Sequence, residues 1–165
     1  MRVRILAIGR LKSGPERDLV ERYRTRCLAL GRGLGFAGPD LVEIPEGRAR
    51  RDVERRADEA LRLRERAGGA QLLLLDEAAP AMTSEAFAGR LAELRDAGQP
   101  DLALVIGGPD GFDPDFKRQG AWSVSFGRFT LPHQLVRVLA TEQLYRAFTI
   151  IAGHPYHRAG DEGGA

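Results

Sequence analysis

Five short, mainly apolar and strand-prone runs lie along the chain, and polar, helix-prone stretches separate them; the runs near 71–75 and 102–106 are almost continuously apolar. An apolar run of four to eight residues without alternation is typical of a strand buried on both faces of a parallel sheet. Glycine, proline or aspartate follows several of these runs and marks where each strand stops. The pattern predicts strands over residues 3–8, 41–44, 71–75, 102–106 and 122–126.

The intervening stretches repeat their apolar positions every three to four residues, as one face of a helix does. One such stripe contains Leu19, Val20, Tyr23 and Cys27. The predicted helices cover residues 15–30, 51–67, 84–97, 113–120 and 132–147.

Side-chain chemistry supports several of these helices at their ends and along their surfaces. Thr83 or Ser84 is expected to cap the third helix, and Thr130 is a candidate cap for the last one. Oppositely charged residues four positions apart predict ion pairs along the helix surfaces. These pairs are Asp58 with Arg62, Arg55 with Glu59, and Glu142 with Arg146.

Alternation of strand and helix predicts an α/β fold with a mostly parallel sheet and helices on both faces. Ligands of such folds bind outside the carboxyl ends of the strands. This rule brings residues 75–76, 107–108 and 126–131 to one edge of the sheet. The glycine-rich stretch 31–39 is expected to be a flexible connector.

Length and charge limit the function classes. The 165 residues fit one domain, and the net charge is only +2. Residues 1–75 nevertheless carry 17 basic and 11 acidic side chains, whereas residues 76–165 carry 8 and 12. An arginine-rich half is compatible with nucleic acid, although the charge alone favours solvated ion pairs.

No long apolar segment predicts a signal or membrane span, so a cytoplasmic location is expected. The single Cys27 is interpreted as a core residue.

The glycine turn Gly107-Gly108-Pro109-Asp110-Gly111 follows the fourth strand directly. It lacks the G-x-G-x-x-G spacing of a dinucleotide site and the lysine of a phosphate loop. Its free peptide groups could bind an uncharged edge such as a purine ring, or it could be a plain turn. The loop over residues 126–131 leaves the same two alternatives open.

All three histidines lie in the last third of the chain, and two of them belong to His154-Pro155-Tyr156-His157-Arg158. Two histidines without further ligands make a metal site a poor interpretation. No serine lies on a nucleophile elbow, which disfavours a hydrolytic triad. An unstructured tail is one alternative, but we favour a tail that contacts nucleic acid. Arginine can pair with phosphate, tyrosine can stack on a base, and histidine can move a proton.

The last long helix is apolar on more than one side, with Leu135, Val136, Val138, Leu139 and Leu144 distributed around it. Such a helix is either buried or packed on its own sheet and on a partner chain as well. A two-fold homodimer is therefore expected.

Taken together, these segments resemble the ribosomal RNA large subunit methyltransferase H family of the SPOUT superfamily. The likeness covers nearly the whole chain and depends on the order and spacing of several moderately specific motifs. The motifs are the stretches 104–111, 122–125, 130–139, 142–147 and 154–158, with 42–45 and 74–76 before them.

The resemblance implies a C-terminal trefoil knot, in spite of the usual rule that chains do not thread loops. It implies S-adenosylmethionine as cofactor and N3 of a pseudouridine in 23S rRNA of the assembled 70S ribosome as the methylated position. It also implies a homodimer in which the tail of one subunit serves the site of the other. The residues that the resemblance assigns to the cofactor are Leu75, Gly107, Phe126, Gly127, Arg128, Phe129, Thr130 and Leu131.

Catalysis and the RNA substrate are assigned to the tail. Arg158 would stabilise the developing anion, His157 or His154 would accept the proton, and Tyr156 would complete the substrate side. No metal and no membrane are expected to take part. The methyltransferase domain is predicted to span residues 1–158, with 159–165 as a disordered tail. The alternative function is a non-catalytic α/β module that binds RNA or the ribosome.

Overall fold

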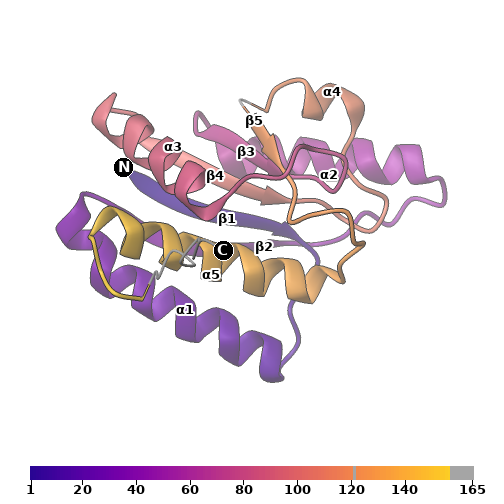
Figure 1. The fold of residues 1–165 in the computed structure, drawn as a ribbon. Helices are drawn as coiled ribbons and strands as arrows, with labels where there is room; N and C mark the ends of the chain where they lie inside the picture. The colour runs from indigo at the N-terminus through magenta and orange to yellow at the C-terminus, as the bar shows by residue number, and fades with distance from the viewer. Residues whose placement is uncertain (121, 157–165) are drawn as a thin grey trace, which may run out of the picture.

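The computed structural model describes residues 1–120 and 122–156, and a five-stranded parallel sheet forms its centre (Figure 1). The strands lie in the order β2-β1-β4-β3-β5. Their bounds are β1 Arg2–Ile8, β2 Ala37–Ile44, β3 Gln71–Leu75, β4 Asp101–Ile106 and β5 Trp122–Val124.

Helices cover both faces of the sheet, so the predicted fold class is confirmed. One face is covered by α1 (Pro15–Gly31), α3 (Ser84–Asp96) and α5 (His133–Ile151), and the other by α2 (Asp52–Ala67) and α4 (Pro114–Lys117). The two faces carry separate apolar clusters because successive side chains of each buried strand point to opposite sides. The knot and the domain boundary stay predictions.

All strand pairs are parallel, so all carboxyl ends meet at one edge. In β3 and β4, Leu75 lies opposite Ile106, and in β3 and β5 it lies opposite Val124. Three segments distant in sequence therefore leave the sheet side by side, and this arrangement positions the candidate site.

Two local predictions about chain connections and caps are wrong. The stretch 31–39 is not a plain connector: it contains a short 3-10 helix, η1 (Arg32–Leu34), and the first residues of β2. Gly38 allows this because its φ is +97°, and a Cβ there would lie 2.2 Å from the carbonyl oxygen of Val3. Thr130 does not cap α5; Pro132 takes the cap position, and the Thr130 hydroxyl donates to Glu77.

Most predicted side-chain contacts on the helices are confirmed. Thr83 caps α3 by accepting the Ala86 N–H, and α5 contains the Glu142–Arg146 pair at 2.6 Å. Arg62 also pairs with Asp58 at 2.6 Å. The last helix continues four residues beyond the predicted end at 147, because its final turns pack in the core.

Cys27 is fully buried, as expected. Burial raises the pKa of its thiol to about 12, so the thiolate that would act as a nucleophile is not formed at neutral pH.

Candidate functional site

A cavity of about 420 Å³ opens at the carboxyl edge of the sheet, between the ends of β3, β4 and β5 and the start of α5. This volume lies in the range of small-molecule sites. Seven of the eight residues assigned to a cofactor by resemblance line the cavity: Leu75, Gly107, Phe126, Gly127, Phe129, Thr130 and Leu131. Arg128 is the exception, because it is exposed and is not part of the lining.

The cavity combines apolar walls with open peptide groups. Ile106, Phe112 and Val136 add to the apolar lining, and the glycine turn after β4 supplies backbone. Phe129 lies at the mouth of the cavity, since the residue is 87% exposed although it contributes to the lining. Such a mixture suits a flat, partly apolar ligand that is recognised through main-chain hydrogen bonds.

The glycines of the turn are required by the packing behind it. The Gly111 N–H donates to the Gly108 carbonyl at 3.0 Å and closes the turn. A Cβ at Gly107 would lie 3.1 Å from the ring of Phe112, and one at Gly108 would lie 2.6 Å from a carboxylate oxygen of Glu59. The turn therefore lies flat on α2 and leaves its other side to the cavity.

Two residues of α2 hold this turn and the β2–α2 connection together. Arg55 donates from Nε to Asp110 at 2.7 Å and from Nη1 to the carbonyls of Ala49 and Arg50 at 3.0 and 2.8 Å. One turn further along, Glu59 accepts the Gly47 N–H at 2.8 Å. The predicted pairing of Arg55 with Glu59 is wrong because each side chain reaches across to a loop instead.

The electrostatics of this pair of residues follow from their surroundings. Glu59 is only 4% exposed, and burial raises the pKa of its carboxyl, helped by the negative charges of Asp110, Glu46 and Asp58. The hydrogen bond from Gly47 opposes this shift. The pKa of Asp110 is lowered, chiefly by its hydrogen bond to Arg55.

Charged groups lie at the cavity as well. Arg56 contributes to the lining, and its buried Nε has no hydrogen-bond partner in the described part of the chain. Asp76 and Lys117 pair at 2.5 Å on the same wall. A buried donor without a partner is uncommon in folded proteins.

The first turn of α5 is fixed by a contact that the sequence did not indicate. Arg137 is 3% exposed and donates from Nη2 to the carbonyls of Ile8 and Gly9 at 2.8 and 2.9 Å, and from Nη1 to Glu43 at 3.1 Å. Burial lowers the pKa of its guanidinium, and Glu43 opposes that effect. His133 and Val136 of the same helix line the cavity, so Arg137 sets their position relative to the sheet.

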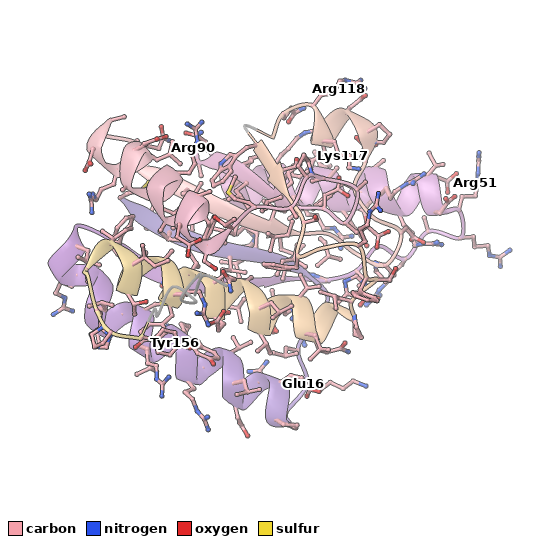
Figure 2. The ribbon with its side chains drawn as sticks, in the orientation of Figure 1. Glu16, Arg51, Arg90, Lys117, Arg118 and Tyr156 are labelled. Atoms are coloured by element: carbon pink, nitrogen blue, oxygen red, sulfur yellow. The ribbon has the colours of Figure 1, made fainter. Side chains whose placement is uncertain are left out.

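The C-terminal segment lies elsewhere in the same subunit. The ring of Tyr156 packs edge-on against that of Tyr145, with 4.8 Å between the ring centroids, and its hydroxyl donates to Glu142 at 3.3 Å. Tyr156 lies on the side where α5 meets α1 (Figure 2). Burial raises the pKa of Tyr156 to about 12. His154 is exposed, and neither residue lines the cavity. His157 and Arg158 lie outside the described residues.

A smaller cavity of about 250 Å³ lies on the α3 and α5 side of the same loop. It shares Leu75 and residues 124–127 with the larger cavity, so the segment at the end of β5 separates the two cavities. Among the described residues, no three side chains of His, Cys, Asp or Glu gather as a metal would require. None of the described helices has the length and apolar character needed to cross a bilayer.

These features define a class: a parallel α/β protein with a ligand cavity at the carboxyl edge of its sheet, built from strand ends and one loop. Residues 1–157 match the family described as "Predicted SPOUT methyltransferase". The chain therefore belongs to the SPOUT methyltransferase family.

Curated relatives match over almost the full length. A protein of Methylobacterium radiotolerans named "Ribosomal RNA large subunit methyltransferase H" is 55% identical over 96% of this chain and 98% of its own. A protein of the same name from Rhodopseudomonas palustris is 52% identical over 96% of this chain and its own entire length.

Two solved structures also match, at lower similarity. A Legionella pneumophila methyltransferase in complex with bound SAM has a TM-score of 0.43 at 13% identity, over 89% of this chain and 66% of that one. The methyltransferase AviRb of Streptomyces viridochromogenes with AdoMet has a TM-score of 0.42 at 16% identity, over 92% and 58%. At this level neither likeness supports an argument about the site.

Proposed function

We propose that this chain is an S-adenosylmethionine-dependent methyltransferase that modifies N3 of a pseudouridine in 23S rRNA of the assembled 70S ribosome. The observation that carries the proposal is the cavity at the carboxyl edge, whose lining contains seven of the eight residues assigned to the cofactor. The names of relatives at 55% and 52% identity support ribosomal RNA of the large subunit as the substrate.

The residues at the cavity fit the cofactor. Its adenine would be enclosed by apolar side chains such as Leu75 and Leu131 and read by the free peptide groups of the glycine turn. The unpartnered Nε of Arg56 suits the carboxylate of the methionine part, and Asp76 suits its ammonium group. When bound, S-adenosylmethionine supplies a methyl group that its sulfonium already activates.

The remaining work of the chain is to position the acceptor and remove its proton. Orientation of the acceptor nitrogen accounts for a large share of the rate in such transfers. We assign proton acceptance to His157 or His154 and stabilisation of the developing anion to Arg158. Tyr156 would act as a donor, because with a pKa of about 12 its phenol stays protonated at neutral pH.

A homodimer would let the tail serve a cavity although the two lie apart within one subunit. Neither His154 nor Tyr156 reaches the cavity of its own subunit, so the tail of the partner is expected to complete the site. We infer that the two subunits pair so that each tail faces the cavity of the other. Neither a metal nor a membrane is required, and a cytoplasmic location fits a ribosomal substrate.

The test combines transfer and product analysis. Purified protein, methyl-labelled S-adenosylmethionine and 70S ribosomes from a strain lacking the gene should yield 3-methylpseudouridine, identified by mass spectrometry of nucleosides. Cofactor binding by calorimetry without any transfer would favour the non-catalytic ribosome-binding module instead. Transfer to a different nucleoside would refute the assigned substrate position.

The role of the tail is tested by shortening the chain. A truncation after Gly153 should keep the fold and the affinity for S-adenosylmethionine but lose methyl transfer, because residues 154–158 are removed. A matched truncation after residue 158 removes only residues 159–165 and should retain full activity. Full activity in the shorter protein would contradict the assignment of catalysis to the tail.

A further inference from the structure

Five exposed cations surround the edge of the sheet at which the cavity opens. They are Arg10, Lys12, Arg48, Arg50 and Arg128, and we call them the basic edge. Within residues 1–120 and 122–156, none of these side chains has a hydrogen bond, an ion pair or a ring contact. Cations elsewhere are usually engaged, as Arg24 is with Glu21 and Arg90 with Glu93.

The topology explains why these residues gather. Arg10 and Lys12 follow β1, Arg48 and Arg50 follow β2, and Arg128 lies in the loop after β5. Because all strands are parallel, these connections leave the sheet at its carboxyl edge, beside the glycine turn after β4 (Figure 1). Four strand spacings separate β2 from β5, which is about 19 Å at the usual spacing.

Carboxylates at this edge offset only part of the charge, because two of them are paired with cations outside the basic edge. Asp110 is paired with Arg55 and Asp76 with Lys117. Glu46 lies over Gly9, and Glu77 accepts a hydrogen bond from Thr130. Further positive charge comes from Arg51, which projects into solvent at the start of α2 (Figure 2) and has only an exposed pair with Glu54 at 3.3 Å.

The β2–α2 connection is also held in place against the cavity. Arg55 binds the carbonyls of Ala49 and Arg50, within this basic stretch, and Asp110 of the glycine turn at the same time. Glu59 fixes Gly47 from the same face of α2 and lies beneath Gly108. The cations are therefore presented by a loop whose position relative to the cavity is set by hydrogen bonds.

We propose that the basic edge contacts the phosphate backbone of the RNA substrate and holds the target nucleotide over the cavity. This inference depends on the proposed function and extends it to the surface that docks the substrate. Exposed arginines without partners lose no ion pair when they bind phosphate, and they release counterions from the RNA. Phosphate contacts of this kind position a nucleic acid without reading its sequence.

The experiment measures steady-state methylation of 70S ribosomes by two double variants, Arg48→Gln with Arg50→Gln and Arg10→Gln with Lys12→Gln, at several KCl concentrations. The KM for ribosomes should rise about tenfold in each, with kcat and the affinity for S-adenosylmethionine unchanged. The slope of log KM against log salt should decrease by about 1 to 2, in line with one or two lost phosphate contacts. Arg128 is left intact because its loop contributes to the cavity.

The matched control replaces Arg32 and Arg66 by Gln. Both are exposed, neither has an ion pair among the described residues, and both lie toward the opposite edge of the sheet. The control should keep the wild-type KM and salt slope. Unchanged KM and slope in the edge variants, or equal changes in the control, would overturn the inference. If the wild-type protein itself transfers no methyl group, the proposed function fails instead, so the two failures are distinguishable.

Discussion

Replacement of Arg137 by Ala should be among the most destabilising changes that leave the strands intact. The variant loses the donors to the carbonyls of Ile8 and Gly9 and the ion pair with Glu43. The guanidinium is 3% exposed, so these groups regain little solvent when it is removed.

The expected loss in the free energy of unfolding is the cost of removing one partner of a buried ion pair, about 3 to 5 kcal/mol. For a chain of this size, that cost corresponds to a decrease of roughly 6 to 20 °C in Tm. Glu43 limits the loss, because it still accepts the Leu11 N–H at 2.7 Å and lies 3.5 Å from Arg17.

The assay is thermal and urea unfolding at a fixed protomer concentration, since dimerisation would make Tm concentration-dependent. Arg137→Met keeps most of the volume and should remain destabilised, because the carbonyls still lose their donors. Arg118→Ala is the control: it breaks an exposed pair with Asp115, worth about 0.5 kcal/mol or less. A loss below about 1 kcal/mol in Arg137→Ala would refute the reasoning from burial.

Two further changes test the support behind the glycine turn. Glu59→Gln keeps an acceptor for the Gly47 N–H but cannot ionise. Because burial raises the pKa of Glu59 in the folded state, the wild type loses stability as pH rises from about 4.3, the unfolded value, through the folded pKa. The variant should therefore gain stability relative to the wild type over that interval, as measured by urea unfolding from pH 4 to 8; a difference independent of pH would contradict the cause. Gly108→Ala places a Cβ 2.6 Å from the Glu59 carboxylate, so it should cost about 1 to 3 kcal/mol and weaken cofactor binding in calorimetry. Adding Glu59→Ala should restore part of that loss, and no recovery would show that the clash is not its source.

Local patterns were sufficient to predict the strands and the ligand edge. An apolar run that ends in Gly107 and Gly108 predicts a buried strand followed by a close backbone approach, and both are found. The residues of the loop 126–131 alone leave its role open, and the resemblance assigns it to the cofactor. The structure places all five of its residues other than Arg128 at the cavity.

Contacts between distant residues could not be predicted in this way. Arg55 and Glu59 have the spacing of a helical ion pair, yet each binds a loop. In the folded protein, Arg55 pairs with Asp110 at 2.7 Å and Glu59 accepts the Gly47 N–H at 2.8 Å. Gly38 looked like part of a flexible connector, but its positive φ lets β2 begin beside the Val3 carbonyl.

The sequence alone determined the order of strands and helices, the burial of Cys27 and the edge at which a ligand would bind, because these depend on periodicity and on glycine chemistry within a few residues. The tertiary structure decided the sheet order β2-β1-β4-β3-β5, the anchoring of α5 by Arg137 and the position of Tyr156 away from its own cavity. Arg137 binds carbonyls 128 and 129 positions away. No local pattern encodes such a contact, because it exists only once the chain has brought the end of β1 and the start of α5 together.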